Sequence, residues 1–189
     1  MRDAMGPEWI VLVVLAGLAL YAAYLFNRLV RLSNLAAEAW SGIDVQLRRR
    51  TDLVPNLVTA VKAYAAHERA LFEDLAARRA GSVAADTVAN QATAERALQS
   101  SLGRLLALAE AYPDLKADRN FRQLQDQLAE IEDQLQMARR YYNGTVRDLN
   151  VAVQSLPDLL VARLAGFGPK PFFEIEDGDA AAPQVEFSR

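Results

Sequence analysis

The feature that most constrains this sequence is an uncharged apolar run from Trp9 to Phe26. As a helix, its 18 residues would span about 27 Å, close to the thickness of the hydrocarbon core of a bilayer. Trp9 lies at one end of the run, and Tyr21 and Tyr24 lie near the other, where amphipathic rings prefer the level of the lipid headgroups. The run therefore predicts a transmembrane helix over residues 9–26.

A cleaved signal peptide is the alternative interpretation of this run. Its leader contains two acidic residues, Asp3 and Glu8, and the run is longer than the roughly 7–15 apolar residues of a signal peptide. No small-residue cleavage site follows it closely. The sequence therefore favours a retained membrane anchor.

The charges beside the run predict its orientation. Arg2 precedes it, whereas Arg28 and Arg31 follow it directly. Basic flanks stay in the cytoplasm, so we expect a short extracytoplasmic N-terminus at residues 1–8 and a cytoplasmic domain. Because the difference in charge is small and large domains translocate largely regardless of charge, a periplasmic domain remains the alternative.

Composition limits the chemistry that is open to this chain. It has no Cys and one His, which excludes disulfides, thiolate metal sites, a cysteine nucleophile and any site with two imidazoles on one chain. The 21 basic and 24 acidic residues give a net charge of −3, and no clustered basic face for nucleic acid is visible. We expect no metal, no cofactor and no nucleic-acid partner.

Apolar residues after the run recur at the spacing of one helical face. Two positions of this face are charged, Arg50 and Glu68, and they lie about 27 Å apart along a helix. Each therefore needs a partner from another helix, Arg139 being one candidate for Glu68, or water. The apolar members of the face include Leu29, Leu32, Ala36, Trp40, Ile43, Leu47, Val54, Leu57 and Val61.

The segment around Pro55 permits two interpretations. Asp52 could cap a new helix with Pro55 in its first turn, or one helix could continue through Pro55 with a kink. The apolar phase passes Arg50 without a slip, which favours the continuous helix. Both alternatives remain open at this point.

The rest of the chain also has helical signals. Gly81-Ser82 followed by Asp86-Thr87 indicates a stop and a capped restart, and Tyr112-Pro113 ends the next helix. From Asp118 a three-and-four apolar rhythm continues to Val153. These patterns predict an all-α fold, with a helical bundle over residues 27–168. Residues 169–189 form an acidic tail, which is expected to be partly disordered unless aromatic residues such as Phe172 and Phe173 dock on the bundle.

One short motif occurs twice. The spacing Phe26-Asn27-x-x-Val30-Arg31-x-x-Asn34 returns as Tyr142-Asn143-x-x-Val146-Arg147-x-x-Asn150. In each copy the two Asn are seven residues apart and share a helix face. The repetition suggests that the two segments lie side by side near the membrane.

Several longer segments carry a family resemblance. They read WSGIDVQLRRRTDLVPNLV from Trp40, YAAHE from Tyr64 and AEAYPDLKA from Ala109, followed by Ala138-Arg139-x-x-Tyr142-Asn143. With these segments in this order, the sequence resembles the LemA family over about residues 9–187, although Phe26 stands where a Tyr is usual. The resemblance implies a bacterial inner-membrane protein with one N-terminal span and an antiparallel four-helix bundle, and no established enzymatic activity. Some relatives belong to magnetosome membrane formation, and others are encoded near a membrane zinc metalloprotease.

The only candidate acid/base pair is His67-Glu68. Adjacent residues project about 100° apart on a helix, and no second His follows at the spacing of a metalloprotease motif. A buried or interfacial polar network is therefore the favoured interpretation. Glu95, Glu110, Glu132 and Asp133 are best interpreted as charged helix surface, because a di-metal bundle needs more His.

Two segments around proline are candidate contact sites. Asp52 to Asn56 and Tyr112 to Lys116 place polar groups at expected helix interruptions, where freed backbone groups can bind a partner. Simple turn and cap chemistry is the alternative. The full set of structural or partner-contact candidates is Arg50, Asp52, Pro55, Asn56, His67, Glu68, Tyr112, Pro113, Arg139, Tyr142, Asn143 and Asn150.

The expected function follows from the anchor, the bundle and the resemblance. We expect a non-catalytic, membrane-anchored scaffold or adaptor that forms homo-oligomers and acts in membrane organisation or envelope homeostasis. One alternative is an accessory subunit of a membrane metalloprotease. The other is a hydrolase that uses His67 and Glu68.

Overall fold

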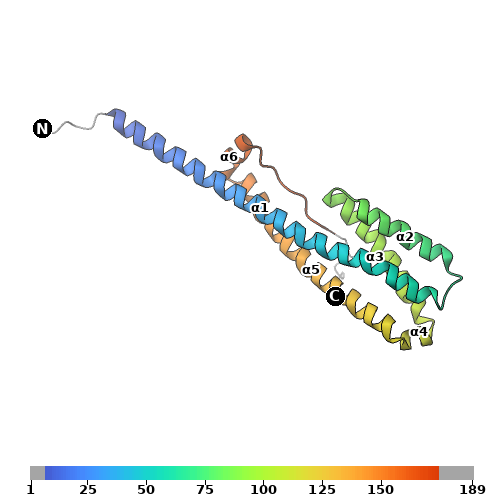
Figure 1. The fold of residues 1–189 in the computed structure, drawn as a ribbon. Coiled ribbons are helices and arrows are strands. Elements are labelled where there is room, and N and C mark those ends of the chain that lie inside the picture. The colour runs from blue at the N-terminus through green and yellow to red at the C-terminus, as the bar shows by residue number, and fades with distance from the viewer. Residues whose placement is uncertain (1–6, 175–189) are drawn as a thin grey trace, which may run out of the picture. The chain divides into compact units, whose positions relative to one another are not determined.

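The computed structural model describes residues 7–174, and this part of the chain is helical without any strand. The all-α prediction is therefore confirmed. Residues 1–6, and residues 175–189 of the expected acidic tail, lie outside the described residues. The helices are α1 (Pro7–Lys62), α2 (Arg69–Ala84), α3 (Val88–Glu110), α4 (Pro113–Ala117), α5 (Arg119–Gln154) and α6 (Asp158–Ala165) (Figure 1).

The apolar run forms the exposed first part of α1. The side chains of Trp9, Tyr21, Tyr24 and Phe26 are 44–63% exposed, and only 6% of the most apolar 18-residue window is buried. A row of apolar residues this exposed is unusual in water. By length and composition α1 can cross a membrane, as the sequence predicts.

α1 continues through Pro55 to Lys62 as one helix, so the interpretation as a fresh start at Asp52 is wrong. α2 extends to Ala84, and Gly81-Ser82 therefore lie inside a helix rather than at its end. The expected restart is confirmed, because the Thr87 side chain accepts a hydrogen bond from the backbone N–H of Asn90 at 3.2 Å. α5 is capped in the same way by Asp118.

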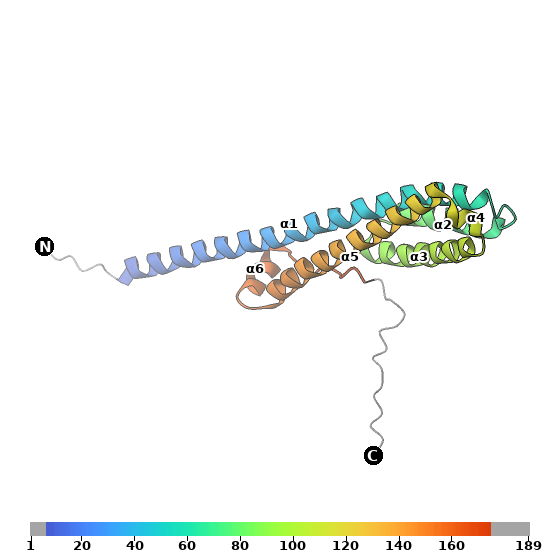
Figure 2. The same cartoon turned by 90° about the horizontal axis from the view of Figure 1, so that it is seen from below.

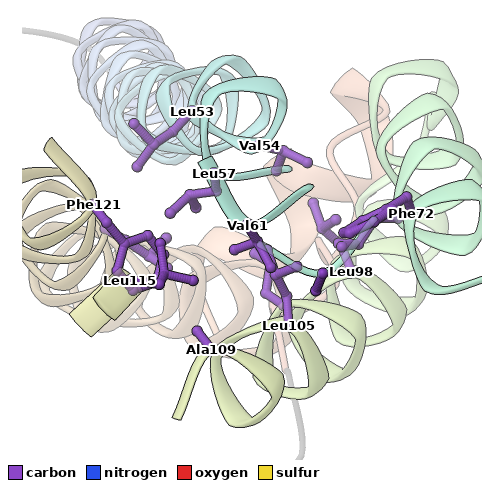
Figure 3. Packing of buried hydrophobic residues seen from close by; sticks show 14 residues of the cluster. Leu53, Val54, Leu57, Val61, Phe72, Leu98, Leu105, Ala109, Leu115 and Phe121 are labelled. Atoms are coloured by element: carbon purple, nitrogen blue, oxygen red, sulfur yellow. The ribbon is translucent and has the colours of Figure 1, made fainter. Parts of the chain in front are cut away.

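The described residues form two compact units, unit 1 (residues 7–43 and 137–171) and unit 2 (residues 44–136 and 172–174). In unit 2, α2 packs against α3, and parts of α1 and α5 complete a four-helix arrangement that α4 closes at one end. Apolar side chains from all five helices converge on one core (Figure 3). Its members include Leu57, Val61, Phe72, Leu98, Leu105, Leu115 and Phe121.

In unit 1, α1 and α5 run antiparallel (Figure 2). The rings of Trp40 and Tyr142 lie 5.3 Å apart, and Leu29, Ile43 and Leu149 are buried. α6 follows α5 and lies beside α1 in both views. Gly166 ends α6 with φ of 76°, a left-handed conformation that favours glycine. Pro157 directly precedes this last short helix.

Candidate functional site

A buried charged cluster lies inside unit 2. The Arg50 guanidinium from α1 is fully buried and forms an ion pair with Glu95 of α3, which is also fully buried. Its other terminal nitrogen, Nη1, donates to Glu132 Oε1 of α5 at 2.7 Å. The expectation that Arg50 finds its partner on another helix is thus confirmed, with carboxylates from two helices.

Glu95 is enclosed by further donors. Ser82 of α2 donates its hydroxyl to Glu95 Oε1, and the Gln91 amide donates to the same oxygen at 2.7 Å. Because the Arg50 guanidinium takes the other oxygen, both carboxylate oxygens accept hydrogen bonds from protein groups. The cluster pairs the buried charges with each other and joins α1, α2, α3 and α5 at one level.

Glu95 is the member of this buried cluster that the sequence does not predict as such. The prediction that it lies on the helix surface is wrong, because its exposure is 0%. A usable signal was present, because Glu95 occupies the apolar face of its helix between Ala92 and Leu98, as Arg50 does in α1. An acid and a base that both interrupt apolar faces are natural partners for each other.

The backbone at Pro55 is satisfied within the protein. Proline has no N–H, so the carbonyl of Thr51, four residues earlier, loses its helical hydrogen bond. Arg79 of α2 donates its Nε to this carbonyl at 2.7 Å. The segment from Asp52 to Asn56 is therefore not a helix interruption, and the carbonyl that lacks a helical hydrogen bond is bonded to Arg79 rather than left for a partner.

A surface cavity of about 410 Å³ adjoins the cluster. Ser82 and Gln91, which both donate to Glu95, form part of its wall, together with charged residues from α1 and α2. Positive and negative side chains are mixed in this wall, so it offers no uniform field to a charged ligand. The charged members are Asp44, Arg48, Asp52 and Arg79.

His67 and Glu68 lie on the turn between α1 and α2. Their side chains are 71% and 42% exposed, and His67 Nε2 lies 3.7 Å from Glu68 Oε1. The Tyr112 hydroxyl approaches His67 Nε2 to 3.5 Å. A buried polar network at these residues is therefore wrong, because α1 ends at Lys62 and both side chains are exposed on the turn. An interfacial network, the other form of the prediction, stays a prediction.

Unit 1 holds a second polar cluster, around Lys170. The Asn150 side chain donates to the Lys170 carbonyl at 2.9 Å and accepts from the Lys170 N–H at 2.8 Å. Lys170 Nζ donates to the Ser33 carbonyl at 3.1 Å. Asn150 and Ser33 therefore share Lys170 as a partner, whereas Tyr142 contacts Trp40, which lies outside the first copy of the repeated motif. The side-by-side placement of the two copies stays a prediction.

Tyr142 belongs to the same chain return. Its hydroxyl donates to the Pro171 carbonyl at 3.0 Å, and burial raises the pKa of the phenol above its ordinary value. Arg139 and Asn143 are half-buried on α5. Asp52, Pro55, Asn56 and Pro113 are exposed in unit 2.

The described residues include no group that is placed to hold a metal. Among residues 7–174, no three His, Asp or Glu side chains gather in a way that could bind an ion.

The model of the LemA family matches residues 39–187, which is most of the chain. The chain belongs to the LemA family. Among the relatives of this LemA-family protein is Magnetosome protein MamQ of Magnetospirillum gryphiswaldense, 26% identical over 97% of this chain and 80% of the relative. Magnetosome proteins MamQ 1 and MamQ 2 of Paramagnetospirillum magneticum are each 25% identical over 92% of this chain and 75% of the relative. The resemblance of the sequence to this family is confirmed.

Proposed function

We propose that this protein is a membrane-anchored, non-catalytic scaffold that organises a membrane by holding copies of itself or another protein at its surface. The observation that carries the proposal is the continuity of α1, which runs from the exposed apolar residues to Lys62 without a break. Anchor and folded residues therefore share one helix. The names of the magnetosome relatives support a role in membrane organisation.

The placement of the charged groups supports a non-catalytic role. Arg50 and Glu95 are buried and use each other as partners, so neither faces a ligand. His67 and Glu68 lie on an exposed turn, where no enclosed site excludes bulk water from their side chains. These positions favour a structural function over acid/base chemistry.

We place the bundle on the cytoplasmic side of the cell membrane. Arg28 and Arg31 follow the apolar run, and only Arg2 precedes it. Because the chain has no Cys, a Glu73→Cys variant carries a single thiol, on the exposed surface of α2. A membrane-impermeant maleimide should label it only after the inner membrane is permeabilised, and labelling before that step would place the bundle outside.

The partner surface that we propose lies on α1 around Asp52 and Asn56. Both residues are exposed and line a surface groove of about 450 Å³ together with Gln127 and Glu130 of α5. They are four residues apart and therefore lie on one helix face. The groove lining mixes polar and apolar surface, as contacts between folded proteins generally do.

The test is single-cysteine crosslinking in intact membranes. Asn56→Cys should give abundant crosslinked dimers if copies associate, or crosslinks into one other protein, such as a membrane metalloprotease, if the protein is an adaptor. Glu73→Cys, on another exposed face, is the matched control. Equal crosslinking from both positions would contradict the proposed surface.

A separate variant tests the hydrolase alternative. Removing both side chains with His67→Ala and Glu68→Gln should leave the fold and the crosslinking pattern unchanged, because both side chains are exposed. If this double variant folds and crosslinks like the natural protein but no longer supports the protein's function in cells, the hydrolase alternative is favoured.

A further inference from the structure

Three leucines at and around α6 are exposed in a regular row. Leu156, Leu160 and Leu164 are 71%, 60% and 90% exposed. Leu160 and Leu164 are four residues apart and share one face of α6, and Leu156 lies in the turn before the helix, two residues ahead of Asp158. Scattered exposed leucines are ordinary, but two on one helix face with a third in the turn before the helix indicate a surface that something covers.

The opposite face of α6 is fixed to α1. Asp158 is buried, and its Oδ2 accepts from Arg28 Nη1 at 2.6 Å. The Phe167 ring lies 5.9 Å from that of Phe26 in an edge-on arrangement. α6 is therefore held beside α1 at the point where the apolar run ends, and its leucine row cannot turn inward without breaking these contacts.

The exposed row continues an apolar surface that begins on α1. A shallow hollow of about 370 Å³ lies between the two helices, and its walls are almost entirely apolar. They consist of Ala22, Ala23, Phe26 and Asn27 from α1 and Val161, Leu164 and Ala165 from α6. A bilayer that contains residues 9–26 reaches its headgroup level at this height.

Basic side chains close to α6 also suit contact with a lipid surface. Arg31 and Arg163 are both exposed, and the nearest acid on α6, Asp158, is buried in its pair with Arg28. Exposed arginines beside an apolar helix face can keep their guanidinium groups among the headgroups while their stems cover apolar surface. They also attract anionic lipids.

We propose that α6 is an interfacial helix that inserts Leu156, Leu160 and Leu164 into the headgroup and acyl boundary of the leaflet that α1 enters. Its ligand is an anionic lipid surface. This inference rests on the proposed anchoring by α1 and goes beyond it, since it gives the protein a second, shallow contact with one leaflet.

The experiment places a polarity-sensitive fluorophore on single cysteines in the full-length protein, reconstituted in vesicles of phosphatidylcholine and phosphatidylglycerol. Leu160→Cys and Leu164→Cys report on α6. Met137→Cys, an exposed apolar position on α5 in the same unit, is the matched control. Leu15→Cys, in the middle of the apolar run, reports on anchoring.

Probes on α6 should show a blue-shifted emission and protection from an aqueous quencher, while the Met137 probe stays in water. Nitroxide lipids should place the α6 probes about 5–10 Å below the headgroup boundary, shallower than the Leu15 probe. The shift should not change when the protein is diluted in the membrane. Phosphatidylcholine alone should reduce the shift.

Three results would overturn the inference. If the Leu15 probe is in lipid but both α6 probes are in water, the anchor stands and the interfacial helix fails. If protection of α6 disappears on dilution in the membrane, a second copy covers the leucines instead of lipid. If all probes, including that at Leu15, are in water, the proposed anchoring itself fails.

Discussion

Arg50 and Glu95 come from helices that are far apart in sequence, and their side chains pair in unit 2 with both of them fully buried. The desolvation cost of burying two charges offsets much of the attraction between them, so such a pair adds little net stability. Its main effect is to penalise arrangements in which either charge lacks its partner. The pair therefore selects one register of α1 against α3.

Breaking this pair from one side should be costly. Arg50→Met leaves Glu95 buried without its cation and should lower the free energy of unfolding by about 3–5 kcal/mol. Glu95→Met should cost less, because Arg50 keeps Glu132 at 2.7 Å. The double variant should regain most of the loss. Denaturant unfolding in detergent micelles, followed by circular dichroism, measures these values.

The matched control for this series is Arg48→Met. Arg48 lies two residues away and pairs with Asp44 at 2.8 Å on the surface, where its side chain is 77% exposed. An exposed pair contributes about 0–1 kcal/mol. A loss for Arg50→Met no larger than that for Arg48→Met would contradict the structural role of the buried pair.

The contact between Arg79 and the Thr51 carbonyl predicts coupling to Pro55. In the natural sequence Arg79→Met should cost about 1–2 kcal/mol, because it leaves the carbonyl of the buried Thr51 without its charged donor. In a Pro55→Ala background the helix supplies its own N–H to Thr51, so the same substitution should cost less than about 0.5 kcal/mol. A double-mutant cycle of unfolding free energies measures the difference. Equal costs in both backgrounds would contradict the replacement of the helical bond by Arg79.

Asp74 predicts a loss of stability in acid. The Ser101 hydroxyl donates to its carboxylate at 2.6 Å and, with Arg78 and Arg104 nearby, holds the pKa of Asp74 below its ordinary value. A carboxyl group with a lowered folded-state pKa stabilises the protein above its unfolded pKa of about 3.9, and this contribution is lost as the pH falls through the folded value. Thermal midpoints between neutral pH and pH of about 2 should therefore fall less steeply in Asp74→Asn than in the natural protein.

The control for the acid prediction is Asp133→Asn, which removes an exposed carboxylate of α5. It changes the net charge by the same amount without touching the Ser101 contact. If both variants flatten the acid limb equally, general charge repulsion explains the effect and the Asp74 cluster does not.

Replacing Gly166 should carry a conformational cost without any steric clash. An L-residue in the left-handed region costs about 1–2 kcal/mol, and a Cβ added at Gly166 would meet no atom within 4 Å. Gly166→Ala should therefore lower the free energy of unfolding and speed amide exchange in α6. Gly168→Ala, which is equally unhindered and lacks the positive φ, should be near neutral. A neutral result for both would mean that α6 can end without a left-handed residue.

Periodicity explains why so much of the fold could be predicted from the sequence. Three features depend only on residues that are near one another in the chain, so the spacing of apolar residues and prolines predicts them. They are the helical face that passes Arg50, the break at Pro113 and the apolar rhythm of α5. Thr87 is a similar case, because its capping bond reaches only three residues along the chain. The continuous α1 was favoured for the same reason, since its apolar phase does not slip.

The candidate site was harder to predict, because it depends on which helices meet. Spacing shows that Arg50 needs a partner but carries no information on the register that brings Glu95 to it. The outward turn at His67 depends on where α1 ends, and no capping residue marks that end. The return of the chain to Asn150 is set by backbone atoms of Lys170, which leave no trace in composition.

The paired hydrogen bonds between Asn150 and Lys170 also bear on how this protein can vary through evolution. The contact uses only main-chain atoms at position 170, so it can persist when the residue there changes, at the loss of the single bond to Ser33. At position 150 it needs one donor and one acceptor on a short planar group. Asp lacks the donor, Gln is too long and Ala offers neither. Selection on this return of the chain therefore acts on residue 150 and leaves residue 170 freer to drift.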